Sequence, residues 1–218
     1  MSDAAAVVEH VDGDTVSVRR LFDDARGCEK FAQRILSFGP GRSRQRVETG
    51  ADETLYVLGG AAILAVCAGY QILGNTFTVG YRDEVISGLG LLDATTTRGP
   101  VRAVGEIISR WNGRAGRDRW ITGFENHGGY TRLGPGVTPL AAVEIGVGNC
   151  NDGTEGAVAG TVIGTYPHGP ILARNPALAD HILELALGHE LEPLAHPEIN
   201  KLRRQRLARV RRSYARSR

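Results

Sequence analysis

The sequence lacks any apolar run of about 18 residues, which is the length that a helix needs to cross a membrane, so we expect no transmembrane segment. Its first residues also lack the basic start and the long apolar centre of a signal peptide. The three cysteines, Cys28, Cys67 and Cys150, occur at unrelated spacings that match neither a disulfide framework nor a zinc site. Together these features predict a cytoplasmic protein without a bound metal.

A phosphate-binding loop is also missing. The pattern Gly-x4-Gly-Lys-Ser/Thr, in which backbone N–H groups and a lysine hold the phosphates of a nucleotide, does not occur in the sequence. We therefore expect that this chain does not itself bind ATP, and that any ATP-dependent step takes place on another protein.

The formal net charge of +2 hides an uneven distribution along the chain. Residues 201–218 carry nine lysines and arginines and no acid, whereas the first 200 residues carry 17 basic and 24 acidic side chains. The simplest interpretation of this basic tail is a solvated or disordered segment. The alternatives are contact with anionic membrane lipid or with nucleic acid, and the lack of a series of base-stacking aromatic residues argues against nucleic acid.

Strands and helices are both expected. The β-rich runs are 55–58, 63–66, 101–108, 120–124, 140–145 and 158–166. Helical spacing occurs over residues 28–38 and from Gly69 to about Thr78, and a further helix begins at Asn175 and ends at Gly188. Residues 125–129 read as a turn-rich loop. This mixture favours an α/β fold.

The spacing of the first two β-rich runs is unusual. Only the four residues from Gly59 to Ala62 separate them, whereas parallel neighbouring strands need a crossover of about a dozen residues. Either the two runs form an antiparallel hairpin, or one of them is not a sheet strand, or a crossover helix has been lost.

Cys67 follows an apolar run and precedes small residues and a helical stretch. A sharp strand-to-helix turn lifts one side chain above a sheet and points the first N–H groups of the helix at it. A thiol in that position loses its proton more easily and becomes a nucleophile. The alternative is a buried cysteine with no chemical role.

A nucleophilic thiol needs a base and an oxyanion site. His168 is the best candidate base because it follows a β-rich run and lies between prolines, at the expected rim of the sheet. His127 is its rival, and Glu125 is a candidate for orienting the base. The backbone N–H groups of Gly60 and Ala68 are candidate oxyanion donors.

Five motifs occur in one order along the chain. They are Leu64-Ala-Val-Cys-Ala-Gly-Tyr-Gln-Ile-Leu-Gly74, Gly88-Leu-Gly-Leu-Leu-Asp93, Thr122-Gly-Phe-Glu-Asn-His-Gly-Gly129, Gly148-Asn149 and Gly164-Thr-Tyr-Pro-His-Gly-Pro170. Together they resemble class I glutamine amidotransferases of the cobyric-acid-synthase type, and within that group the GatD-type glutaminase subunits of lipid II isoglutaminyl synthase. The resemblance extends from about Leu55 to the C-terminus.

This resemblance implies a three-layer, flavodoxin-like α/β fold with helices on both faces of the sheet. Residues 1–54 would be a divergent N-terminal segment, residues 55–200 the glutamine amidotransferase domain and residues 201–218 a basic C-terminal tail. The Tyr-Gly-Asp-x-Gly-Asn-like loop of the family is not found in residues 1–50, and the helix that precedes the nucleophile strand is missing. The N-terminal part is therefore expected to be truncated or rearranged.

The resemblance also assigns roles to residues. It makes Cys67 the nucleophile, His168 the catalytic histidine and Arg102 an arginine that binds the carboxylate of glutamine. Such subunits hydrolyse L-glutamine and pass ammonia to a MurT-like subunit of the Mur ligase family. That partner uses ATP and Mg²⁺ to amidate the D-glutamate of lipid II in peptidoglycan synthesis.

The implied protein is thus a cytoplasmic subunit of a heterodimer, at the inner face of the membrane, which needs no cofactor of its own and binds no nucleic acid. Two alternatives remain open at this point. The chain is a non-catalytic, partner-binding subunit with a degenerate site, or it is a related amidotransferase that acts on a corrinoid acid.

Overall fold

The computed structural model describes residues 8–10, 16–22, 33–38, 62–113, 119–192 and 197–216. The chain divides into two compact units, one of residues 1–53 and 57–60 and the other of residues 54–56 and 61–218. The expected strand at 55–58 and the candidate oxyanion donor Gly60 lie outside the described residues.

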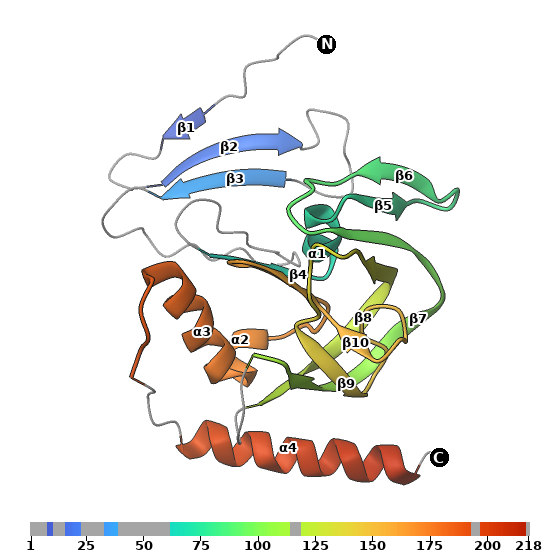
Figure 1. Ribbon diagram of the computed structural model, residues 1–218, viewed down its shortest axis with the longest axis vertical. Helices are drawn as coiled ribbons and strands as arrows, with labels where there is room; N and C mark the ends of the chain where they lie inside the picture. Colours follow the sequence, from blue (N-terminus) through green and yellow to red (C-terminus); the bar gives the residue numbers. More distant parts are fainter. Residues whose placement is uncertain are drawn as a thin grey trace. The chain divides into compact units, whose positions relative to one another are not determined.

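The first unit contains a small antiparallel sheet. Its strands are β1 (Val8–His10), β2 (Val16–Phe22) and β3 (Gln33–Phe38), in that order (Figure 1). The helix expected over residues 28–38 is wrong for its second half, because β3 pairs with β2 along its length. Cross-strand pairing overrides the weak helical spacing of a few apolar residues.

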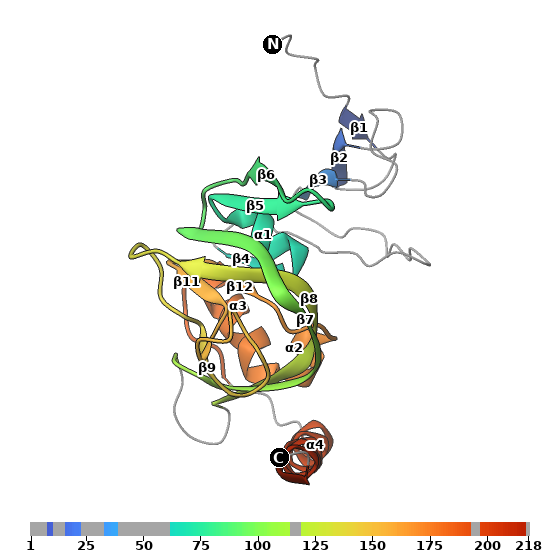
Figure 2. The same ribbon diagram turned by 90° about the vertical axis from the view of Figure 1, so that its right-hand side faces the viewer.

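The larger sheet of the second unit is built around a long hairpin. Its strands are β5 (Thr76–Val79), β6 (Glu84–Ser87), β7 (Ala94–Trp111), β8 (Trp120–Leu133), β9 (Ala141–Ile145) and β10 (Thr154–Glu155). Strands β7 and β8 form the antiparallel hairpin, whose curve is seen in Figure 2. The order across the sheet is β10-β9-β7-β5-β6, with β8 paired to β7. The pairing of β7 with β8 shifts between Arg98 and Ala103, so the residues between them bulge from the hairpin.

A second, three-stranded sheet holds the N-terminal strand of the described part of this unit. Its order is β11 (Ala157–Ala159), β12 (Val162–Thr165) and β4 (Ile63–Val66). Strands β12 and β4 are parallel, with Thr165 opposite Val66, so their carboxyl ends meet at one edge. The strand predicted over 63–66 is therefore confirmed.

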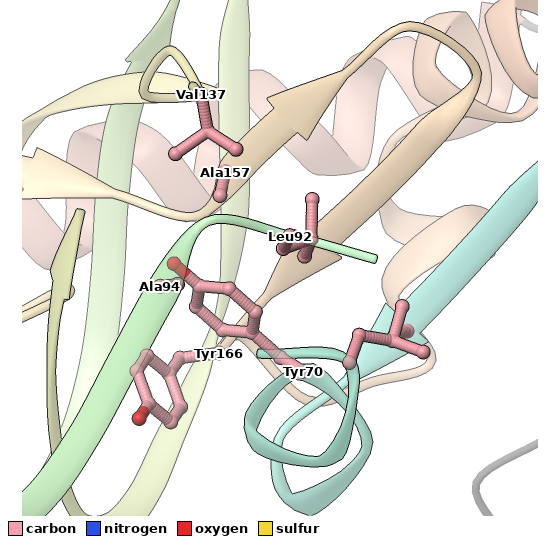
Figure 3. Packing of buried hydrophobic residues seen from close by; sticks show 8 residues of the cluster. Tyr70, Leu92, Ala94, Val137, Ala157 and Tyr166 are labelled. Carbon is pink, nitrogen blue, oxygen red and sulfur yellow. The ribbon is translucent and has the colours of Figure 1, made fainter. Parts of the chain in front are cut away.

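Helices cover both faces of this three-stranded sheet, as its alternating side chains require. One face packs with α1 (Ala68–Leu73) and the start of β7, in a core that includes Ala65, Tyr70 and Leu92 (Figure 3). The other face packs with α2 (Ile171–Arg174) and α3 (Pro176–Leu187), in a core that includes Ile163 and Leu178. The predicted α/β class is confirmed, and this three-stranded sheet has helices on both of its faces.

Two local predictions need correction. The helix expected to reach Thr78 ends at Leu73, and the β-branched residues that follow form β5. The turn-rich loop expected at residues 125–129 is part of β8. A Cβ atom at Gly129 would lie 2.4 Å from Nε2 of Gln71 and 2.7 Å from Cγ2 of Thr96, so this glycine allows a close approach between elements and does not make a turn.

The helix predicted to begin at Asn175 and to end at Gly188 is confirmed as α3, and Gly188 has the left-handed conformation expected at a C-terminus. Asn175, however, makes no side-chain cap. Its amide instead accepts from the Thr122 N–H at 2.9 Å and donates to the Thr122 carbonyl at 2.9 Å. Asn175 therefore ties the start of α3 to strand β8.

The basic tail forms helix α4 (Pro197–Arg216) instead of the unstructured segment expected from its charge. Arg203 is 9% exposed and donates to the Trp120 carbonyl at 2.7 Å. Arg211 pairs with Glu144 and lies over the ring of Trp120. No helix among the described residues is both long enough and apolar enough to cross a membrane.

Candidate active site

Cys67 occupies a strained turn between β4 and α1. Its backbone angles are φ 52° and ψ −114°, a conformation that residues other than glycine rarely adopt. The turn is held by the Cys67 N–H, which donates to the Thr165 carbonyl at 2.9 Å, and by the Gln71 N–H, which donates to the Cys67 carbonyl at 3.3 Å. The predicted strand-to-helix turn is confirmed, and strain of this kind is characteristic of functional positions.

His168 belongs to the same edge of the three-stranded sheet. Its chain segment leaves β12 at Thr165, directly opposite the end of β4. The backbone of His168 is fixed to Phe124 of β8, with its N–H donating at 2.8 Å and its carbonyl accepting at 3.3 Å. Because β4 and β12 are parallel, Cys67 and His168 both follow carboxyl strand ends of one edge, where sites of α/β sheets form.

Tyr166 holds the segment between Thr165 and His168 in place. Its ring stacks on His127 with centroids 3.7 Å apart and meets the edge of Tyr70 at 5.2 Å. The hydroxyl lies 2.6 Å from Oγ1 of Thr131 and accepts from Nε2 of Gln71 at 3.3 Å. Burial raises the pKa of Tyr166 to about 12, so its hydroxyl keeps its proton at neutral pH. Sequence reasoning missed this tyrosine.

The rival base His127 has a different setting. Its side chain is nearly fully buried, its Nδ1 lies 2.8 Å from the Gly129 carbonyl, and its Nε2 lies 3.5 Å from Oε1 of Glu125. Glu125 in turn accepts from the N–H groups of Val147 at 2.8 Å and Gly148 at 2.6 Å. This geometry ties His127 into the packing behind the site. The role of Glu125 in orienting His168 stays a prediction.

Arg102 lines a cavity of about 500 Å³ in the bulge between β7 and β8. Its Nε donates to Oδ1 of Asn126 at 2.9 Å, which orients the guanidinium group. Arg98 and Gln71 line the same cavity, and Gln71 also reaches Tyr166 on the segment that carries His168. A guanidinium group at such a cavity can pair with a small carboxylate, and the role of Arg102 in binding glutamine stays a prediction.

Ala68 is the first residue of α1 and directly follows Cys67 in the chain. The backbone N–H groups of the first turn of a helix have no partner within the helix, so they are suited to hold a developing oxyanion. The role of Ala68 stays a prediction, as does that of Gly60, which lies outside the described residues.

Glu155 is a buried acid that sequence reasoning also missed. Its side chain is fully buried, and Oε1 accepts from Oγ1 of Thr165 at 2.9 Å and from the N–H of Tyr166 at 2.9 Å. Burial raises the pKa of Glu155 to about 7, although these two hydrogen bonds oppose the shift. A single acid in a glycine-rich segment gives no periodic signal that could have revealed this position.

Comparison with known proteins decides the family. Residues 47–176 match the CobB/CobQ-like glutamine amidotransferase domain, which is more than half of the chain. The chain belongs to this family. Cys67, Arg102 and His168 all lie within the matched part of this glutamine amidotransferase domain.

Curated relatives of this amidotransferase domain act in two settings. A lipid II isoglutaminyl synthase (glutamine-hydrolyzing) subunit GatD from Streptococcus pneumoniae is 30% identical over 87% of this chain and 74% of the relative. The GatD subunit from Staphylococcus aureus is 37% identical over 63% of this chain and 54% of the relative. A probable cobyric acid synthase from Methanosphaera stadtmanae is 39% identical over 49% of this chain and 23% of the relative.

A solved structure of a glutamine amidotransferase from Thermotoga maritima aligns with 56% of this chain and 48% of its own, at 19% identity and a TM-score of 0.34. That score is too low to carry an argument. The chain spans about half the length of the S. aureus relative, so the activity, substrates and partners of the whole relatives pass to this amidotransferase domain only as proposals.

Proposed function

We propose that this chain is a glutaminase subunit that hydrolyses L-glutamine and supplies ammonia to a separate, ATP-dependent synthase subunit. The observation that carries the proposal is the position of Cys67. This thiol lies in a strained turn at the same sheet edge as the His168 segment, inside the matched amidotransferase domain. The missing phosphate-binding loop supports the assignment of the ATP-dependent step to a partner.

The proposed reaction is acyl transfer to sulfur followed by hydrolysis. The Cys67 thiolate attacks the side-chain carbonyl carbon of glutamine, and the N–H group of Ala68 holds the developing oxyanion. His168 donates a proton to the leaving nitrogen, so that the C–N bond breaks and ammonia departs. His168 then takes a proton from water, which attacks the thioester and releases glutamate and the free thiol.

We propose that the substrate binds in the cavity beside Arg102. The α-carboxylate of glutamine would pair with the guanidinium group, which Asn126 already orients. The side chain of the bound glutamine would then extend toward α1 and Cys67, past Gln71, which lines the same cavity. This cavity of about 500 Å³ has room for a single amino acid.

For the acceptor, we infer the D-glutamate of lipid II, amidated by a MurT-like Mur ligase subunit with ATP and Mg²⁺, in peptidoglycan synthesis. The support is that the two GatD relatives are named as subunits of lipid II isoglutaminyl synthase. A corrinoid acid is the second candidate, because cobyric acid synthases are also relatives. Such a heterodimer would work in the cytoplasm, at the inner face of the membrane.

Glutamate release from glutamine, measured with the chain alone and together with its synthase subunit, tests the proposal. We expect Cys67→Ala and His168→Ala each to lower kcat by at least about 1,000-fold, because the dyad acts as a unit. Cys150→Ala is the matched control. Burial and a hydrogen bond to Asp152 raise the pKa of the Cys150 thiol to about 11, so this cysteine is protonated at neutral pH and its loss should leave kcat unchanged.

A glutamine-analogue electrophile gives a second reading. We expect mass spectrometry to find the adduct on Cys67 and not on Cys150. Turnover that survives in Cys67→Ala would overturn the proposal. A wild-type chain that neither releases glutamate nor forms the adduct would instead favour the non-catalytic, partner-binding subunit.

A further inference from the structure

Glu155 is an unusual residue to place at the back of this site. Its side chain is fully buried, and Oε2 has no hydrogen-bond partner among the described residues. Burying a carboxyl group costs several kcal/mol unless it is compensated, and an apolar side chain of similar volume would avoid this cost. A buried acid at this position therefore calls for a role beyond filling space.

The contacts of Glu155 converge on the junction between the two proposed catalytic residues. Its Oε1 accepts from the hydroxyl of Thr165 and from the N–H of Tyr166, both at 2.9 Å. The carbonyl of Thr165 in turn accepts from the N–H of Cys67 at 2.9 Å. One oxygen atom thus fixes the strand end that supports the Cys67 turn on one side and continues to His168 on the other.

The surroundings of Glu155 hold it in place. Gly156 has a left-handed φ of +64°, and a Cβ there would lie 2.5 Å from the Gly164 carbonyl. The buried amide of Asn149 donates to the Gly156 carbonyl at 2.9 Å and to Oγ1 of Thr154 at 3.0 Å. These contacts fix the backbone on both sides of Glu155, so its carboxyl group has a defined position relative to β12.

We propose that Glu155 is a positioning residue that sets the relative geometry of Cys67 and His168 through Thr165 and Tyr166. The proposal rests on the proposed glutaminase function. Both donors need only an acceptor oxygen, which a neutral carboxyl or an amide supplies as well as a carboxylate does.

The groups that face Glu155 are consistent with a neutral side chain. Among the described residues they are the carboxylate of Glu125 on β8 and the phenol of Tyr70 on α1, beside the hydroxyl of Thr165 and the N–H of Tyr166 that donate to it. None of them carries a positive charge that would favour an ionised carboxyl group.

The experiment compares Glu155→Gln with Glu155→Leu in the full chain with its synthase subunit. Glu155→Gln keeps the acceptor oxygen, so we expect kcat within about threefold of the wild type. Glu155→Leu removes the acceptor, and we expect kcat to fall about 100-fold while KM changes by less than about twofold, because glutamine binds at Arg102 and not at β12. The matched control is Glu144→Gln. It replaces an acid on β9 that pairs with Arg211 of α4, and we expect its kcat to be unchanged.

Thr165→Val keeps the shape of the side chain and removes one of the two donors, so it decides the matter if Glu155→Leu does not fold. We expect its kcat to fall about tenfold at unchanged KM. The rate of Cys67 alkylation by iodoacetamide, which does not depend on glutamine turnover, is measured in the same variants and should fall with kcat.

The two proposals can fail separately. A wild type that releases no glutamate overturns the proposed function, and the alkylation rates then judge the positioning role alone. The positioning role is overturned if Glu155→Leu or Thr165→Val folds and keeps the wild-type alkylation rate. Where turnover exists, such a variant would also keep the wild-type kcat. A Glu155→Gln variant as impaired as Glu155→Leu overturns it as well.

Discussion

At the scale of the residue, two residues that lie near each other in the fold are held in energetically unfavourable states. Cys67 has a positive φ that is uncommon for residues with a side chain, and Glu155 buries a carboxyl group. Thr165 links them, since it bonds to both. Strain and burial of this kind persist only where the surrounding structure determines them, and they cluster at functional sites.

The carboxyl group of Glu155 predicts a pH dependence of stability. Its pKa is raised to about 7 in the folded chain from an ordinary value of 4.5, so the folded state binds the proton more tightly. Stability from this group is fully present below about pH 4.5 and is lost as the pH rises through about 7, by about 3 kcal/mol in total. Urea unfolding from pH 5 to 8 measures the effect.

Other acids contribute to the same pH profile, so the comparison with Glu155→Gln isolates Glu155. That variant should lose less stability between pH 5 and 8 than the wild type does. Two parallel profiles would show that Glu155 has the same pKa in the folded and the unfolded chain, contrary to this prediction.

At the scale of the element, the site depends on the pairing of β4 with β12. The first strand is local in sequence to Cys67, but its partner comes from the far end of the domain. The close packing of α1 on β12 completes the arrangement, because Tyr70 lies against Gly164. The glycine in this strand lets the helix approach closely.

Gly164→Ala tests this packing. A Cβ at position 164 would lie 2.1 Å from Cδ2 of the fully buried Tyr70 ring, which cannot move away without opening the core (Figure 3). We expect the free energy of unfolding to fall by about 2 kcal/mol or more, measured by urea denaturation. Gly160→Ala is the control, because nothing lies within 4 Å of its Cβ and only the positive φ of +57° costs about 1 kcal/mol. Equal losses in the two variants would contradict the packing argument.

Several elements could be predicted from sequence and others could not. Strand β4 and helix α3 have clear apolar patterns and clear ends, and both predictions are confirmed. The prediction of a loop at 125–129 is wrong because these residues pair with β7 as part of β8, where Gly129 makes room for Gln71. Local patterns cannot reveal a neighbour that is distant in sequence.

At the scale of the whole molecule, helix α4 adds a basic surface to the amidotransferase domain. Its inward arginines are used for docking: Arg203 on the Trp120 carbonyl and Arg211 on Glu144. Its exposed side carries Lys201, Arg209, Arg212 and Arg216, which recur at helical spacing. An exposed face of this kind is suited to an anionic surface, such as a layer of anionic phospholipid headgroups.

Vesicle co-sedimentation tests this idea. We expect the wild type to bind vesicles that contain about 30% anionic phospholipid and to be released by salt, whereas zwitterionic vesicles should not bind it. Lys201, Arg212 and Arg216 changed together to Glu should lose binding, because each basic residue contributes about 1 kcal/mol. The control changes three exposed arginines elsewhere, Arg82, Arg110 and Arg132, to Glu and alters the net charge equally. Equal losses in both variants, or preference for duplex DNA over vesicles, would contradict membrane contact.

The sequence by itself determined the family and the strand-to-helix turn that carries Cys67, because these depend on motifs and on contacts between neighbours in the chain. Only the tertiary structure decided what surrounds the thiol: the partner strand β12, the packed Tyr166, the buried Glu155 and the docking of the basic tail as α4. Those features depend on pairing between segments distant in sequence, where burial, and not local preference, sets the energy.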